Sequence, residues 1–189
     1  MKITFVRHAE VIEEYQGKYN GHIDIPLSEN GKLQAEKLAK KLQNEKFDKI
    51  YCSDLIRTRQ TLEAFKYEVE PIYTDKLREK SWGRHEGKSF DEIQKEGIKY
   101  ENFEQWISNL DGEDIKTYTQ KVKEYFYTTI LKQKSLNILV ITHSGFIKTL
   151  LSIVENSQLE ETFKVQLPYA SFIIFDKINM TFNSKSNIF

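Results

Sequence analysis

The sequence predicts an α/β fold, with a mostly parallel central sheet and helices on both faces. Three observations predict it. Short apolar segments alternate with longer segments of helical periodicity, which is the pattern of βαβ units. Residues 137–143 (NILVITH) lack the alternation of a half-exposed strand, as expected of a strand covered on both faces. The length of 189 residues, without a repeat or a linker, fits a single domain over 1–189.

The first expected strand covers 2–7 (KITFVR), because this segment is short and rich in β-branched and aromatic residues. A polar stretch with glycines and a proline follows and is expected to be a loop. The next segment is expected to form an amphipathic helix with Ser28 as its N-cap. Apolar residues recur there at the helical spacing: Ala35, Leu38, Ala39 and Leu42.

The segments that follow predict two further strands with a helix between them. Residues 48–53 (DKIYCS) are typical of a short strand, and 70–75 (EPIYTD) are expected to form another. Residues 54–65 return to a helical pattern, and either Ser53 or Asp54 is able to cap that helix.

In the second half, Ser89 and Glu92 form a capping-box pattern that predicts a short helix at 89–96. A helix at 144–155 is expected behind the strand at 137–143. The remaining expected elements are a helix around 101–110, a helix from about 115 to 132, and a closing hairpin of 169–177 and 179–183. The tail at 184–189 is expected to be frayed.

Composition disfavours several classes of partner. The 28 Lys and Arg residues balance the 28 Asp and Glu residues, and no basic block is present. This balance gives no reason to expect nucleic acid or an anionic membrane as a partner. No segment resembles a secretion signal or a membrane span, so a cytoplasmic location is expected. The single Cys52 is interpreted as a core residue and fits a reducing compartment.

Unusual polar residues stand at the carboxyl ends of three predicted strands. Arg7 and His8 end the first, His143 ends the most apolar one, and Arg57 lies one helical turn beyond the second. Parallel strands place these ends along one edge, where open α/β sheets bind ligands. Taken alone, Arg57 could be a surface charge and His143 a satisfied buried histidine. Their coincidence predicts an anion pocket sized for phosphate.

The residue types in this predicted pocket indicate phosphoryl chemistry. Arginine binds phosphate oxygens bidentately, and a neutral histidine can act as a nucleophile or proton donor. Neither a P-loop motif nor a nucleophile-elbow motif occurs in the sequence. A metal site made of His8, Glu10 and His143 is an alternative, but the flanking arginines would repel a divalent cation. No metal and no cofactor are therefore expected.

Several motifs resemble those of the histidine phosphatase superfamily, whose members share the phosphoglycerate mutase-like fold. The segment VRHAE (6–10) resembles its Arg-His-Gly-Glu signature, and VITHSG (140–145) resembles its last histidine motif. The other matching segments, in the family order, are GHIDIPLSENG (21–31), SDLIRTRQT (53–61) and KLREKSWGRHEG (76–87). Each motif is modest alone, but together they cover most of the chain and are highly specific.

The resemblance implies a phosphatase that works through a phosphohistidine. His8 would be the nucleophile, while Arg7, Arg57 and His143 would hold the phosphoryl oxygens. Glu79 would protonate the leaving oxygen and then help water to attack the phosphoenzyme. Because phosphoryl transfer gathers charge on the equatorial oxygens, fixed cations suit these roles.

The sequence departs from the family pattern near the expected substrate rim. Ala9 replaces the usual glycine, which is a small change. Glu14 falls where an asparagine often touches the phosphate, and its carboxylate is expected to point away or to meet substrate cations. His85 stands where a tryptophan is frequent, and together with Arg84 it is the expected substrate-binding rim.

The resemblance also indicates the class of partner, a small phosphorylated metabolite. The chain is shorter than the cofactor-dependent mutases of the family, which favours net hydrolysis. Among small members the arrangement is most similar to the α-ribazole phosphatases of cobalamin biosynthesis. The alternatives are a broad-specificity sugar or nucleotide phosphatase, a protein phosphohistidine phosphatase, a mutase-type enzyme and a non-catalytic phosphate-binding module. The sequence does not indicate the oligomeric state.

Overall fold

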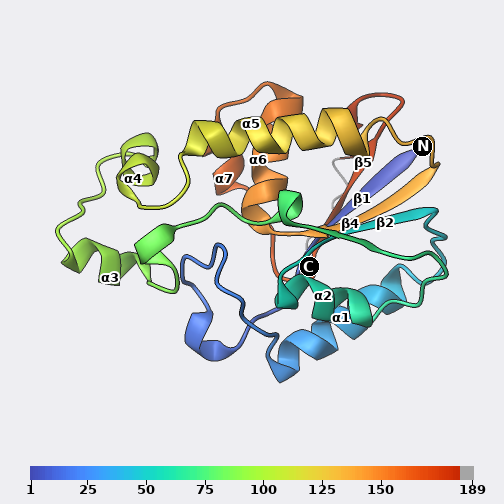
Figure 1. Cartoon of the computed structure of the whole chain (residues 1–189), viewed down its shortest axis with the longest axis horizontal. Helices are drawn as coiled ribbons and strands as arrows, with labels where there is room; N and C mark the ends of the chain where they lie inside the picture. The colour runs from blue at the N-terminus through green and yellow to red at the C-terminus, as the bar shows by residue number, and fades with distance from the viewer. Residues whose placement is uncertain (184–189) are drawn as a thin grey trace.

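One sheet of six strands organises the computed structural model, which describes residues 1–183 (Figure 1). Across the sheet the order is β3-β2-β4-β1-β5-β6; the first four strands are parallel, and β5 and β6 are antiparallel to their neighbours. The bounds are β1 (Lys2–Arg7), β2 (Lys49–Ser53), β3 (Ile72–Thr74), β4 (Asn137–Thr142), β5 (Phe172–Asp176) and β6 (Thr181–Phe182). The expected frayed tail lies outside the described residues.

Helices cover both faces of the sheet, which confirms the expected α/β class. Below it in Figure 1 lie α1 (Glu29–Lys41) and α2 (Ile56–Glu63); above it lie α5 (Ile115–Tyr125), α6 (Ser144–Glu155) and α7 (Leu159–Lys164). Two short helices, α3 (Phe90–Lys95) and α4 (Phe103–Asn109), stand away from the sheet at one end of the molecule. In the described part of the chain, no helix is long and apolar enough to cross a bilayer.

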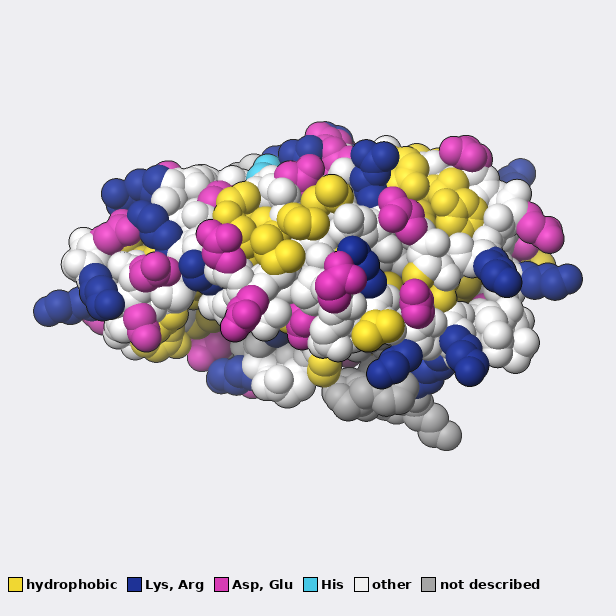
Figure 2. Space-filling view, turned by 90° about the horizontal axis from the view of Figure 1, so that it is seen from below, with side chains coloured by type: hydrophobic (Ala, Val, Ile, Leu, Met, Phe, Trp, Pro, Cys, Tyr) yellow, Lys and Arg dark blue, Asp and Glu magenta, His cyan; other side chains and the backbone are white. Residues whose placement is uncertain are grey.

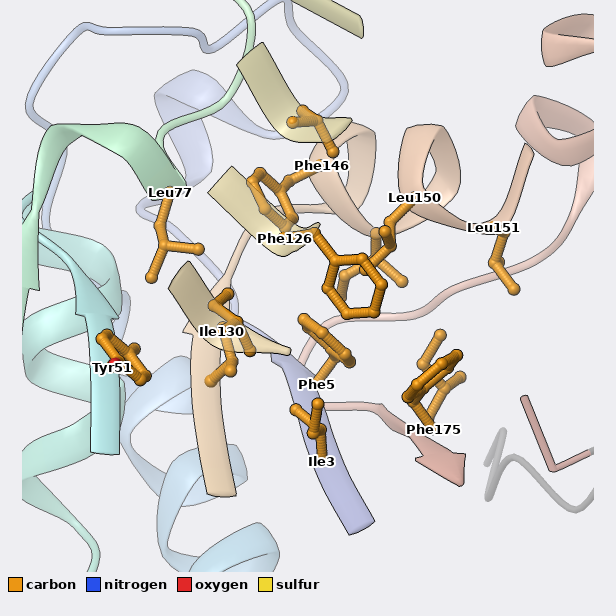
Figure 3. Packing of buried hydrophobic residues seen from close by; sticks show 14 of the residues in the cluster. Ile3, Phe5, Tyr51, Leu77, Phe126, Ile130, Phe146, Leu150, Leu151 and Phe175 are labelled. Atoms are coloured by element: carbon orange, nitrogen blue, oxygen red, sulfur yellow. The ribbon is translucent and has the colours of Figure 1, made fainter. Parts of the chain in front are cut away.

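The central strand β4 is buried on both faces, which explains why its sequence does not alternate. Ile138 and Val140 pack into one core cluster. Figure 3 shows Phe5, Phe126 and Phe175 of the same cluster. On the opposite face, Leu139 and Ile141 pack with Val6 of β1 and with Ala35 and Leu38 of α1. Burying one such side chain contributes about 1.5–3 kcal/mol, so the two clusters hold the strand ends firmly in place.

The surface is consistent with the balanced composition. On the face seen from below, Lys and Arg side chains are interspersed with Asp and Glu side chains (Figure 2). Cys52 is fully buried in the second core cluster, as expected, and burial raises the pKa of its thiol to about 12. The thiol is therefore protonated at neutral pH and has a packing role.

Most expected helix ends are confirmed. Ser28 accepts the N–H of Gly31 at the start of α1, and Ser89 forms a complete capping box with Glu92 at the start of α3. The helix expected from about 115 to 132 ends as an α-helix at Tyr125 and continues as a π-helical turn at Phe126–Ile130.

The expected cap of α2 is wrong. This helix begins at Ile56, and neither Ser53 nor Asp54 caps it. Asp54 instead forms a bidentate ion pair with Arg78, at 2.7 and 2.6 Å. The N–H of Ile56 donates to the Asp24 carboxylate at 2.6 Å, so a residue from an earlier loop accepts a free N–H group at the start of the helix.

Candidate active site

Three strand ends meet at one edge of the sheet and bring the expected residues together. The strands β1, β4 and β2 are parallel neighbours, so their carboxyl ends are aligned. His8 follows β1, Ser53 ends β2, and His143 follows β4 as the N-cap of α6. The ring centroids of His8 and His143 are 5.2 Å apart, in an edge-to-face contact.

His8 is buried and has one ring nitrogen engaged by the backbone. Its Nδ1 lies 2.8 Å from the carbonyl oxygen of Ala9; Nδ1–H donates there, and the lone pair of Nε2 is left free. Burial, together with the charges of Arg57 and Arg7, lowers the pKa of His8 well below its ordinary value. A neutral imidazole with a free Nε2 is the form that nucleophilic attack requires.

Arg7 lies beside His8 and has one hydrogen-bond donor that is not used. Its guanidinium stacks over the ring of Tyr169 at 4.0 Å and donates to the carbonyl of Leu167. Its buried Nε has no hydrogen-bond partner among the described residues. Because an unpaired buried donor costs about 1–3 kcal/mol, Arg7 is suited to receive an anionic oxygen.

Arg57 and His143 form a fully buried pair next to His8. The Nε–H of Arg57 donates to Nδ1 of His143 at 3.3 Å, which leaves Nε2–H of His143 to donate to Ser53 Oγ at 2.9 Å. Burial lowers the pKa of Arg57 to about 10 and lowers the pKa of His143 well below its ordinary value. His143 is therefore neutral and fixed in one tautomer.

The rest of the Arg57 guanidinium binds the loop at 20–23. Its terminal nitrogens donate to the carbonyls of Ile23 at 2.8 Å, Gly21 at 2.7 Å and Asn20 at 3.2 Å. The carboxylate of Glu86 takes the N–H groups of the same loop, including Gly21 at 2.8 Å and Ile23 at 3.2 Å. Arg57 thus holds the loop through its carbonyl groups, and Glu86 holds it through its N–H groups.

Glu79 reaches the same centre from the segment after β3. Its Oε2 accepts the N–H of Gly145 at the start of α6 at 2.8 Å, and its Oε1 accepts the N–H of Lys80 at 3.0 Å. The amino end of α6 carries the positive end of the helix dipole, which favours a carboxylate there.

Arg7, His8 and Glu79 line one cavity of about 340 Å³. The rest of its wall is made by Lys18, Tyr19, Asn20, Trp82, Ser144, Gly145, Lys148, Phe163 and Tyr169. Arg57 and His143 do not reach its surface but support His8 and the loop from behind the wall. The cavity has the size of a small-ligand site, with cationic groups and a carboxylate around one histidine.

The structure does not bring Arg84 and His85 to this cavity. Arg84 is exposed, and its backbone N–H donates to the Asp111 carboxylate at 2.8 Å. His85 is fully buried, and its Nδ1 accepts the N–H of Asp111 at 2.9 Å. The tight turn at Gly83–His85 directs His85 into packing against Asp111, away from the reacting groups.

The two acidic residues near the first motif also lie elsewhere. The carboxylate of Glu10 accepts hydrogen bonds from Ser28 at 2.7 Å and Asn30 at 3.1 Å, so it does not join the two histidines as a metal ligand. Within residues 1–183, no three His, Cys, Asp or Glu side chains are grouped as a metal site. Glu14 is exposed and does not line the cavity, as expected of a carboxylate near a phosphate site.

Comparison with known proteins decides the family. The model of the histidine phosphatase superfamily (branch 1) matches residues 3–185. The chain belongs to the histidine phosphatase superfamily. Phosphoserine phosphatase 1 of Hydrogenobacter thermophilus is 33% identical over 153 residues, covering 76% of this chain and 71% of the relative. The adenosylcobalamin/α-ribazole phosphatase of Salmonella typhimurium is 27% identical over 160 residues, covering 80% and 78%.

A solved structure supports the fold of this histidine phosphatase along its whole length. The α-ribazole phosphatase from Shigella flexneri superimposes with a TM-score of 0.84 and 22% identity, covering 98% of this chain and 95% of that chain. The expected phosphoglycerate mutase-like fold is therefore confirmed.

Sequence reasoning missed several residues of this histidine phosphatase site. Lys148 and Tyr169 line the cavity, and Glu86 holds the loop that Arg57 binds. Lys148 could have been found, because it lies one helical turn after Gly145 and so shares its face of α6. Glu86 carries no such signal, since the loop groups that it binds, the N–H groups of Gly21, His22 and Ile23, lie more than 60 positions earlier in the chain.

Gly145→Ala is expected to reduce turnover at least about tenfold on esters with poor leaving groups. A Cβ at this position would overlap Oε1 of Glu79, so the carboxylate must leave its place beside the N–H of Gly145. Steady-state kinetics with an alkyl phosphate measures this loss. Thermal unfolding of the variant checks that the loss does not come from a general loss of folding. Unchanged turnover in Gly145→Ala would contradict the placement of Glu79.

Acidification below about pH 6.5 is expected to destabilise the fold. Burial, and then the charge of Arg57, lowers the pKa of both His8 and His143, so the unfolded chain binds more protons than the folded chain in this range. The free energy of unfolding therefore rises with pH there, by up to about 1.4 kcal/mol per pH unit for each histidine. Urea titrations between about pH 5 and 7 measure the slope. His8→Asn should reduce it, and an unchanged slope would contradict the assignment.

Proposed function

We propose that this chain is a metal-independent phosphomonoester hydrolase that forms a phosphohistidine at His8. The arrangement of His8 carries the proposal: a neutral imidazole, with Nδ1 held by the Ala9 carbonyl and Nε2 free, lines a cavity together with Arg7 and Glu79. These groups supply the three parts that phosphoryl transfer needs, namely a nucleophile, a fixed positive charge and a proton donor.

In the first step, Nε2 of His8 attacks phosphorus and the ester oxygen leaves. Arg7 offers its unpaired Nε–H to a phosphoryl oxygen, and the protonated form of Glu79 gives its proton to the leaving oxygen as the bond to phosphorus breaks. In the second step, Glu79, now a carboxylate, takes a proton from water as the water attacks the phosphohistidine. Inorganic phosphate leaves, and both residues return to their starting state.

Arg57 and His143 are proposed to stabilise the phosphoryl group from behind His8, without lining the cavity. Arg57 places a buried positive charge beside His8, and His143 contacts the His8 ring. A direct bond from either residue to the phosphoryl oxygens stays a prediction, since their present hydrogen bonds are to Ser53, to each other and to the loop. Release of one loop carbonyl would free a donor of Arg57 for that bond.

We propose α-ribazole 5′-phosphate as the substrate. The cavity wall contains the aromatic side chains of Tyr19, Trp82, Phe163 and Tyr169, which suit a flat aromatic group in the leaving alcohol. A relative named for this activity is 27% identical over most of its length. The wall also contains Lys18 and Lys148, and no role is proposed for Arg84 or His85 in contacting the leaving group. A cytoplasmic location stays a prediction from the sequence.

The basic test is hydrolysis of p-nitrophenyl phosphate by the purified chain. Turnover is expected to persist in the presence of a metal chelator. It is expected to be blocked by vanadate, which mimics the transition state of phosphoryl transfer. Loss of activity with chelator would instead support a metal-dependent mechanism. Binding of phosphate without any turnover would support the non-catalytic binding module.

The substrate is tested by comparing kcat/KM across a panel: α-ribazole 5′-phosphate, phosphoserine, a sugar phosphate, a nucleotide and a phosphohistidine peptide. The highest value is expected for α-ribazole 5′-phosphate. Similar values across the panel would favour a broad-specificity phosphatase. Isomerisation of phosphoglycerate faster than phosphate release would favour a mutase-type enzyme. Phosphoserine is included because a relative named for that substrate is 33% identical.

A further inference from the structure

The mechanism proposed above leaves the buried hydroxyl group of Tyr118 unexplained. Tyr118 lies on α5, is 4% exposed, and packs its ring into the core cluster over the sheet. Its hydroxyl leaves the apolar packing and donates to the carbonyl of Arg78 at 3.2 Å. Burial, followed by the charges of Glu79 and Glu113 and by a hydrogen bond with Glu79, raises the pKa of this phenol well above its ordinary value, so the phenol keeps its proton at neutral pH. Its hydroxyl donates to the Arg78 carbonyl and lines a small cavity together with Glu79, the next residue in the chain.

Glu79 is in contact with two cavities. One contains His8; the other, of about 80 Å³, is lined by both Glu79 and Tyr118. The remaining charged and titratable groups around the small cavity are His22, Asp75, Lys76, Arg78, Glu113 and Lys121. On the side of the larger cavity, Glu79 shares its surroundings with Arg7 and Lys148. The Glu79 carboxylate thus connects the reacting centre to the Tyr118 hydroxyl.

We propose that Tyr118 is a positioning residue for Glu79, whose hydroxyl turns from the Arg78 carbonyl to the Glu79 carboxylate when Glu79 gives up its proton. The inference rests on the proposed role of Glu79 as the acid. A hydroxyl has one hydrogen and serves one acceptor at a time, and it rotates freely between acceptors. Once Glu79 is charged, it is the stronger acceptor, because charge-assisted hydrogen bonds are about twice as strong as neutral ones.

The proton balance of this step is simple. The one proton transferred moves from Glu79 to the leaving oxygen, and Tyr118 keeps its own. The two backbone donors of Glu79, the N–H groups of Lys80 and Gly145, are already bound to its two oxygens in the structure. The Tyr118 donor is added only as the carboxylate forms, so it stabilises the transition state more than the ground state and acts on kcat.

The test compares Tyr118→Phe, Glu79→Gln and the double variant on two substrates. An alkyl phosphate needs its leaving oxygen protonated, whereas p-nitrophenyl phosphate does not. Phenylalanine keeps the ring and its core packing and removes only the hydroxyl. Tyr118→Phe is expected to lower kcat about tenfold on the alkyl ester with an unchanged KM, and to leave the aryl ester near the wild-type rate. Tyr125→Phe, on the same helix but packed against Tyr51, is the matched control and should retain both rates.

The double variant distinguishes positioning from a general structural effect. If Tyr118 acts through Glu79, the double variant is expected to lose no more than Glu79→Gln alone. Equal losses on both esters, or additive losses in the double variant, would overturn the inference and leave the proposed function standing. If Glu79→Gln itself fails to discriminate between the two esters, the role of Glu79 as the acid falls, and the Tyr118 inference falls with it.

Discussion

His8→Ala is expected to abolish turnover and to remove the phosphoenzyme. The variant lacks the only imidazole in the described part of the chain that combines an engaged Nδ1 with a free Nε2 at the cavity. Loss of a covalent nucleophile lowers kcat by several orders of magnitude. The measurement is rapid quenching with labelled substrate, which in the wild type should trap an acid-labile, base-stable phosphoprotein, as expected of a phosphohistidine.

His143→Ala is the matched control for this experiment. It removes the neighbouring imidazole but keeps the nucleophile, so it should still take up label, at a lower rate. Label that persists in His8→Ala would remove His8 from its proposed role. Thermal unfolding of both variants checks that each is folded, because both histidines are buried.

Glu79→Gln is expected to slow an alkyl phosphate about a hundredfold or more, while p-nitrophenyl phosphate loses much less. The amide oxygen can still accept the N–H of Gly145, whereas the amide NH2 group cannot accept the N–H of Lys80, and the side chain has no acidic proton to give. Plotting rate against leaving-group pKa for a series of esters measures the effect, and the variant should show the steeper dependence.

Glu10→Gln is the control for removing one carboxylate near the first motif. Its carboxylate binds Ser28 and Asn30 outside the cavity, so catalysis should be unaffected. Parallel lines for Glu79→Gln and the wild type in the leaving-group plot would show that Glu79 is not the acid.

The sheet could be predicted from the sequence because its signals are local. The apolar run at 137–143 and the short segment at 2–7 have a residue pattern typical of buried strands, and both proved to be strands. The cap of α2 was wrong for the opposite reason. Asp54 has the right chemistry and position to cap, but Arg78, 24 residues later, competes for its carboxylate. A long-range partner of this kind leaves no trace in a local pattern.

The sequence predicted which residues come together in the site, but it did not predict the hydrogen bonds that they make. Parallel strand ends placed Arg7 and His8 near His143 by topology alone. That Arg57 binds the carbonyls of a loop depends on how this loop folds, which neither periodicity nor spacing reveals. His85 illustrates the same limit: its place in the family pattern, where a tryptophan is frequent, suggested the substrate rim, and a single tight turn directs it into the packing instead.

The contact between Arg57 and the loop at 20–23 affects how the substrate specificity of the enzyme could be changed. Arg57 binds main-chain oxygens, which every amino acid provides, so the anchoring is indifferent to loop side chains. Gly21 is the exception, because a Cβ there would overlap a neighbouring backbone carbonyl. Lys18 lines the cavity next to this loop and is the position to exchange first, because the Tyr19 hydroxyl accepts a hydrogen bond from Trp106 and the Asn20 amide donates to the Tyr15 carbonyl. Directed evolution toward new esters would therefore begin at the Lys18 codon, which is separate from the residues that break the bond.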